Sequence, residues 1–200
     1  LSVFDRENWV KPSDESKINI ALYHGSIHGC QTSQGFVIEE GEDSVDIFKD
    51  FDFAMLGDIH KQQRMDLEGR VRYAGSTIQQ NFGESINKGF LMWNIRDKSD
   101  WDCQHVSIVN PRPFITVDLT PKGKVPNTIV PKGCRLRIRS TSNISPMMLK
   151  AACDYAQAKW KPHTVSFVNK GGSQGHGDSL IGKAVQGENL RDIVVQEKYI

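Results

Sequence analysis

The stretch AMLGDIH, residues 54–60, is an apolar run that ends at a glycine and then presents Asp58 and His60. Upstream, INIALYHG, residues 18–25, ends in the same way, with His24 before a glycine. Such runs are typical of buried strands, and α/β proteins carry their chemistry at the carboxyl ends of strands. A single histidine there is more often structural than a ligand. Two strand ends of the same kind leave a structural role and a metal site as equal alternatives.

Size and charge limit the classes of function. The chain has 200 residues, of which 38% are hydrophobic, and 25 Lys and Arg against 24 Asp and Glu. This composition is typical of a globular chain without a global basic field, so any binding of a polyanion must be local. No run approaches the roughly eighteen apolar residues of a membrane span, so we expect no membrane partner. The four cysteines lack ligand spacing, which favours a reduced, cytoplasmic setting.

The first part of the chain reads as an α/β unit. Residues 44–51 predict a short helix, which would complete a β-α-β crossover, and residues 61–70 a surface loop. Strands are expected over residues 17–24, 52–57, 71–74, 88–95 and 102–109, the last two as an antiparallel pair.

A boundary is expected at Asn110-Pro111-Arg112-Pro113, because two prolines two apart interrupt strand pairing. Beyond it the pattern predicts a β-β-α-β module, with strands over 114–119, 135–139 and 164–168 and a helix from Ser145-Pro146 to about Trp160. The expected divisions are therefore residues 1–110, 111–170 and a flexible linker over 171–200, with a possible short helix over 190–199.

His24, Asp58 and His60 form the candidate ligand set. Imidazole and carboxylate together suit Mn²⁺, Fe²⁺ or Zn²⁺, whereas a structural zinc site more often recruits cysteines. A two-metal site, with ions about 4 Å apart, needs more ligands than these three. The set is therefore incomplete by itself.

The motifs, taken together, resemble a known family. In order and spacing, YHG (23–25), LGDIH (56–60), YAGS (73–76), FGE (82–84) and KGF (88–90) resemble the second half of the SbcD-type DNA repair nucleases, among the calcineurin-like metallophosphoesterases. The likeness is closest to phage recombination endonuclease subunits and covers about residues 15–120, and the later module more loosely. It implies the carboxyl-side half of a metallophosphoesterase β-sandwich flanked by helices, followed by a small α+β capping module that orients DNA.

The resemblance also implies roles for the ligand set. His24 and Asp58 would hold one metal ion and His60 the other. Asp58 departs from the family, which mostly has histidine at that position, and its carboxylate would favour harder ions such as Mn²⁺. The family's three upstream motifs are absent from this sequence, so no catalytic residue is assigned, and we expect the chain alone to be inactive.

Substrate contacts are less specific. Gly75-Ser76 resembles a turn at which the family's backbone approaches a phosphate, although a plain strand-ending turn fits equally. Arg135, Arg137 and Arg139 alternate on one strand with a spacing of about 7 Å, which would suit DNA phosphates or the solvated face of an edge strand. Glu84 with Lys88-Gly89 resembles the SbcD-type group more specifically than it resembles other phosphoesterases. The remaining histidines are expected to be surface or structural residues: His28, His105, His163 and His176.

The function implied by the resemblance is a two-metal-dependent exonuclease or endonuclease subunit that hydrolyses phosphodiester bonds at DNA ends in recombination and repair. The usual ion would be Mn²⁺, with Mg²⁺, Fe²⁺ or Zn²⁺ as alternatives. The partners would be DNA and an SbcC-like coiled-coil ATPase, with the full-length protein a homodimer in the cytoplasm, or the host cytoplasm if phage-encoded. Two other functions stay open: a non-catalytic DNA-binding or ATPase-docking module, and a small-substrate phosphodiesterase, which the module after Pro113 disfavours.

Overall fold

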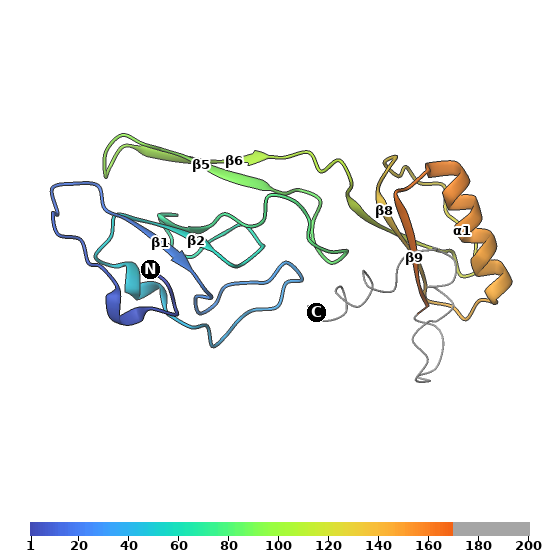
Figure 1. Cartoon of the computed structure of the whole chain (residues 1–200), viewed down its shortest axis with the longest axis horizontal. Coiled ribbons are helices and arrows are strands. Elements are labelled where there is room, and N and C mark those ends of the chain that lie inside the picture. Colours follow the sequence, from blue (N-terminus) through green and yellow to red (C-terminus); the bar gives the residue numbers. More distant parts are fainter. Residues whose placement is uncertain (170–200) are drawn as a thin grey trace. The chain divides into compact units, whose positions relative to one another are not determined.

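The computed structural model describes residues 1–169, and Figure 1 traces them from blue to orange. The chain divides into two compact units between Asn110 and Pro111. Each unit has its own hydrophobic core. The described residues form a mixed α/β structure with several sheets and few helices. The linker and short helix expected after residue 170 lie outside the described residues.

The first unit is built on a four-stranded sheet in the order β1-β2-β4-β3. The strands span Ile20–His24 (β1), Phe53–Gly57 (β2), Gln63–Arg64 (β3) and Val71–Tyr73 (β4). β1, β2 and β4 are parallel, and β3 pairs antiparallel with β4. The carboxyl ends of β1, β2 and β4 therefore meet at one edge of the sheet. Residues 61–70, expected to be a loop, contain the short β3.

The connection between β1 and β2 contains no α-helix. The segment expected to be a helix over 44–51 forms one 3₁₀ turn, η2, at Val45–Phe48, capped by the Ser44 hydroxyl. Val45 and Ile47 pack against the core, and these β-branched residues are weak helix formers that a single turn accommodates. The other helical segment of residues 1–110 is the 3₁₀ turn η1 at Arg6–Asn8. The expectation that helices flank this unit is therefore wrong for the described residues.

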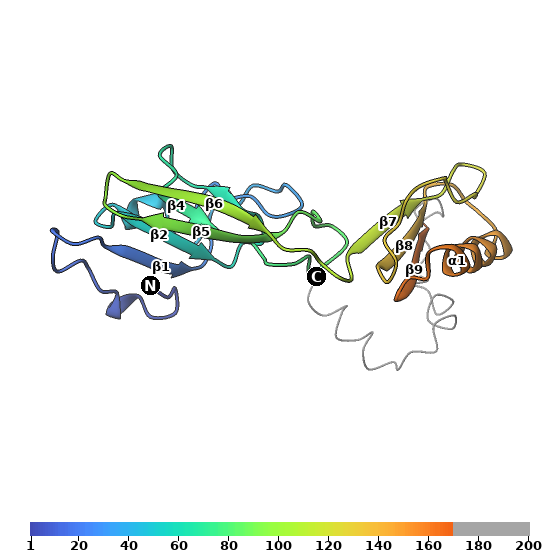
Figure 2. The same cartoon turned by 90° about the horizontal axis from the view of Figure 1, so that it is seen from above.

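A hairpin forms the second layer of this unit. It pairs β5 (Gly89–Ile95) with β6 (Trp101–Ser107). In Figure 1 the hairpin and the sheet are seen as two separate layers, and in Figure 2 the two layers overlap. Phe53 from β2 meets Trp93 and Trp101 edge-on, with ring centroids 5.9 and 5.3 Å away. The buried Arg72 guanidinium lies 5.4 and 5.7 Å from the same two indole centroids. Aromatic and cation–π contacts therefore join the layers.

The second unit is a three-stranded parallel sheet, in the order β7-β8-β9, with one helix. Its elements span Phe114–Asp118 (β7), Arg135–Ser140 (β8), Pro146–Trp160 (α1) and Thr164–Asn169 (β9). Leu136 and Ile138 are buried in one cluster with Ala152 and Ala156 of α1. The Ser145 hydroxyl caps the helix by accepting from the Met148 amide at 3.3 Å. β8 is the central strand, so the edge-strand interpretation of its arginines is wrong.

Tyr73 couples the core to the loop after β1. It is fully buried, donates its hydroxyl to the Gly25 carbonyl at 2.7 Å and accepts from the Ile27 amide at 2.9 Å. We predict that Tyr73→Phe lowers the free energy of unfolding by about 1–3 kcal/mol, because two buried backbone groups lose their partner. Urea unfolding measures this loss. The control Tyr155→Phe, at a half-exposed ring, should change stability little. Equal effects of the two substitutions would contradict this role of Tyr73.

Candidate functional site

His24 and Asp58 lie side by side at the carboxyl edge of the sheet. The register of β1 and β2 places His24 opposite Gly57, the residue before Asp58. A Cβ atom on Gly57 would lie 3.1 Å from Cδ2 of His24, so the glycine gives the imidazole room to lie against β2. The His24 and Asp58 side chains are both exposed. The matching strand ends seen in the sequence are therefore neighbours in space.

Asp58 has an unusual backbone conformation, with φ at 87°. Residues other than glycine rarely adopt positive φ, and the strain costs on the order of 1–3 kcal/mol. Among residues 1–169, only Lys161, the C-cap of α1, shares this property. A strained backbone directly after a strand is typical of functional sites, where it fixes the direction of a side chain.

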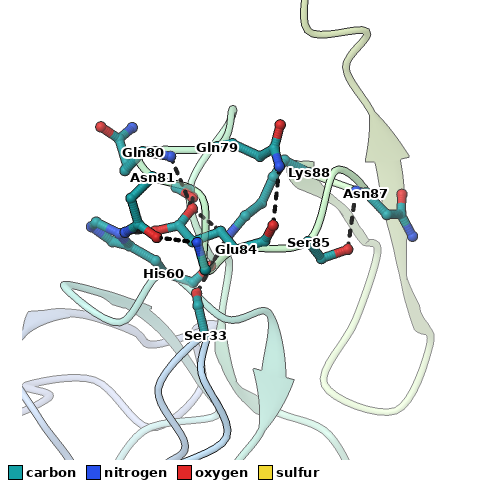
Figure 3. Close-up of polar contacts among 11 residues, drawn as sticks. Ser33, His60, Gln79, Gln80, Asn81, Glu84, Ser85, Asn87 and Lys88 are labelled. Carbon is teal, nitrogen blue, oxygen red and sulfur yellow. Dashed lines mark hydrogen bonds and ion pairs between the residues drawn. The ribbon is translucent and has the colours of Figure 1, made fainter. Parts of the chain in front are cut away.

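His60 is held by a buried carboxylate. Its Nδ1 lies 2.9 Å from Oε1 of Glu84 (Figure 3). The Glu84 side chain is 1% exposed and that of His60 49%. Because the ionised carboxylate only accepts hydrogen bonds, Nδ1 carries the proton, and in the neutral ring Nε2 keeps its lone pair. A carboxylate that fixes the tautomer in this way is the usual outer partner of a metal-binding histidine.

Several donors keep Glu84 ionised. It accepts from the Gln80 amide at 3.0 Å, from Nζ of Lys88 at 3.1 Å and from Nδ2 of Asn81 at 3.3 Å (Figure 3). Burial acts to raise the pKa of Glu84, but the Gln80 amide, His60 and Lys88 outweigh it and lower the pKa below its ordinary value. The carboxylate is therefore charged at neutral pH.

Lys88 ties the segment after β4 to the loop that carries His60. Its side chain is 7% exposed, and besides the Glu84 carboxylate its Nζ donates to the His60 carbonyl at 2.6 Å. The sequence marked Glu84 and Lys88 as a motif without a role. An acidic and a basic residue four apart in a stretch rich in Gln and Asn was the available signal, and only the folded loop shows that His60 is their common partner.

Gly75 and Ser76, which follow β4, contact the loop that carries His60. Gly75 has φ at +78°, and a Cβ on it would lie 2.9 Å from the Gln62 amide nitrogen and 3.1 Å from the His60 carbonyl oxygen. The Ser76 amide donates to the His60 carbonyl at 3.3 Å. Packing against the His60 loop thus requires glycine at position 75, and the two residues line one cavity with His60.

The three proposed ligands are not gathered around one point. In the part of the chain that the structure describes, no three His, Cys, Asp or Glu side chains form a group that could hold a metal ion. His24 adjoins Gly57 and Asp58, while His60 is anchored by Glu84. The assignment of these residues as metal ligands stays a prediction.

The three arginines belong to the second unit. Leu136 and Ile138 face the core, so Arg135, Arg137 and Arg139 share the other face of β8. Arg139 forms a two-point ion pair with Asp118, and Arg135 donates to the Arg112 carbonyl at 3.1 Å. Burial lowers the pKa of Arg137, and the neighbouring Arg139 lowers it further. Much of this charge is thus engaged within the unit.

Comparison with known proteins adds little about activity. No family model matches the sequence. An uncharacterized protein, R555, of Acanthamoeba polyphaga mimivirus is 35% identical over 133 residues, which make up 66% of this chain and 10% of that protein. The match thus spans about a tenth of the length of the viral protein. Separately, none of the helices within residues 1–169 is long and apolar enough to cross a membrane.

Glu84→Gln tests the buried carboxylate. The variant leaves Lys88 charged and buried without its ion-pair partner, so we predict a loss of about 3–5 kcal/mol in the free energy of unfolding at pH 7. The lowered pKa of Glu84 means that its contribution is complete above the ordinary value of 4.5 and is lost as the pH falls through the folded value. The difference between wild type and variant should therefore shrink below pH 4.5.

Glu84→Gln/Lys88→Met provides the control, because it removes both charges together and should recover part of the stability. Urea unfolding at several pH values measures all three proteins. A penalty for Glu84→Gln that does not change with pH, or a double variant no more stable than the single one, would contradict the ion pair.

Substitutions of Asp58 test whether its backbone is strained. Glycine tolerates positive φ and alanine does not, so we predict that Asp58→Gly is more stable than Asp58→Ala by about 1 kcal/mol. At exposed Asp50, which lacks positive φ, the order should reverse because glycine gains more entropy on unfolding. Thermal unfolding of the four variants gives the comparison. Alanine as stable as glycine at position 58 would remove the strain argument.

Proposed function

We propose that this chain is the carboxyl-side part of an SbcD-type metallophosphoesterase, a two-metal nuclease subunit that hydrolyses phosphodiester bonds at DNA ends. The observation that carries the proposal is the His60–Glu84 pair. A buried, ionised carboxylate holds Nδ1, and Nε2 makes no hydrogen bond within residues 1–169. An exposed imidazole fixed in this way, at the edge where His24 and Asp58 also lie, is suited to donate to a metal ion.

The donor set fits the proposed ions. Two imidazoles and a carboxylate suit borderline and hard divalent ions, so Mn²⁺ is the first choice and Mg²⁺, Fe²⁺ and Zn²⁺ are alternatives. His24 and Asp58 would hold one ion and His60 the other. When bound, two such ions polarise the phosphate and lower the pKa of an attacking water. Glu84 orients His60 for this task, and the strained Asp58 directs its carboxylate.

The remaining parts of the proposal concern substrate and partners. DNA is the proposed substrate and an SbcC-like ATPase the proposed partner, with the second unit as the module that orients DNA. The support is the series of motifs from residue 23 to residue 90. The site described here supplies three ligands and no general acid, so a complete enzyme needs further residues, and we expect this chain alone to lack nuclease activity.

Manganese binding tests the proposal. We predict that His60→Ala weakens Mn²⁺ binding by the 200-residue chain about 10- to 100-fold, whereas His28→Ala, at another exposed histidine, leaves it unchanged. Electron paramagnetic resonance of unbound Mn²⁺ gives both affinities directly.

Equal Mn²⁺ affinity of wild type, His60→Ala and His24→Ala would refute the site. A parallel cleavage assay with linear duplex DNA checks whether the chain holds a complete active site. Manganese-dependent cleavage that His60→Ala abolishes would show that the chain holds a complete active site, contrary to the expected inactivity.

A further inference from the structure

A small cavity opens beside His60 within the first unit. Its volume is about 170 Å³. Three loops supply most of its wall, those at 60–62, 74–76 and 85–89. Besides His60, Ser76 and Lys88, the residues with polar side chains on the wall are Ser33, Lys61, Gln62, Ser85, Asn87 and His105. The cavity is therefore a polar one at the margin of the proposed metal site.

The charged groups on the wall have one sign. The lining residues include Lys61 and Lys88 but no aspartate or glutamate. Lys88 is neutralised by Glu84, whose side chain is almost fully buried. The Lys61 ammonium donates to the amide oxygen of Gln31 and forms no ion pair within residues 1–169. Of the two cations on the wall, Lys61 is thus the one whose charge no acidic side chain within residues 1–169 neutralises.

His105 reaches the cavity from the hairpin. It lies on β6 opposite Leu91. A Cβ on Gly89 would lie 2.0 Å from the Val106 carbonyl oxygen and 2.9 Å from Nε2 of His105, so glycine at this position admits both the neighbouring backbone and the imidazole. Ser33, Ser85 and the Asn87 amide complete a set of neutral donors. One cation with several neutral donors is a combination that binds anions with oxygen acceptors.

The cavity's size limits the anion. Its volume of about 170 Å³ lies well below the 300–1,000 Å³ of pockets for drug-sized ligands. A phosphate group fits this space, but a whole nucleotide does not. An internal backbone phosphate carries a sugar on each side, whereas a terminal phosphate carries only one and has more negative charge. The small volume and the positive charge together favour a terminal phosphate.

We propose that this cavity binds the terminal phosphate of a DNA strand, with Lys61 as its charged contact and His105 and the neighbouring hydroxyls as further donors. The DNA part of this inference rests on the proposed function; the anion site itself does not. The site is separate from the metal ligands His24 and Asp58, and it would fix the end of a strand beside His60.

Binding of two probes by the 200-residue chain in EDTA tests the inference. The probes are inorganic phosphate and a single-stranded oligodeoxynucleotide with or without a 5′- or 3′-phosphate. We predict that Lys61→Gln weakens binding of phosphate and of one phosphorylated oligonucleotide about tenfold. For that oligonucleotide it should also reduce the slope of log affinity against log salt by about 0.7, the value for one phosphate contact on a single strand.

Matched variants separate the site from general charge effects. Lys49→Gln removes the same charge at an exposed position outside the cavity and should leave both affinities unchanged. Lys61→Arg keeps the charge and should retain most of the binding. His105→Gln provides a second test of the wall if Lys61→Gln folds poorly, and its thermal unfolding should match that of wild type.

Two results would overturn the inference. Equal phosphate affinity of wild type, Lys61→Gln and His105→Gln would remove the anion site. Equal affinity for all the oligonucleotides, with or without terminal phosphates, would remove the assignment to a strand end. Because EDTA removes the metal ions, phosphate binding by a chain that fails to bind Mn²⁺ would leave the anion site standing while the metal site falls.

Discussion

The candidate site depends on one buried carboxylate. Glu84 accepts hydrogen bonds from the Gln80 backbone amide, from the imidazole of His60 and from the ammonium of Lys88. Burying an ionised carboxylate is costly unless such partners compensate it, so the loops must close around it in one arrangement. That arrangement fixes the ring of His60. The orientation of the proposed metal-binding nitrogen is thus a consequence of how one charge is neutralised.

The sheet provides the other constraint. Parallel pairing of β1 and β2 places His24 against Gly57, and Tyr73 fastens the loop that follows β1 by two hydrogen bonds. The same sheet is held to the hairpin by edge-on aromatic contacts of Phe53 and by the Arg72 guanidinium over the hairpin indoles. The exposed ends of the strands therefore rest on a rigid layer, which is the general reason that α/β proteins place reactive groups there.

The sequence predicted the parts of the fold that depend on local patterns. Apolar runs located the strands, and Ser145-Pro146 located the start of α1. It failed where tertiary packing decides. The segment around Val45 is a single 3₁₀ turn because the core needs its apolar side chains, and the alternation of β8 could not tell a central strand from an edge strand. The roles of Glu84 and Lys88 depend on a meeting of distant loops that no periodicity encodes.

The central claim is that Glu84 holds His60 with its Nδ1 protonated and its Nε2 ready to bind a metal ion. Long-range ¹H–¹⁵N correlation spectra of the histidine rings in the 200-residue chain test it most directly. We predict the Nδ1-protonated tautomer for the neutral ring of His60, and broadening of its ring signals on addition of Mn²⁺ that EDTA reverses. An Nε2-protonated His60, or ring signals that Mn²⁺ leaves unchanged, would contradict the account.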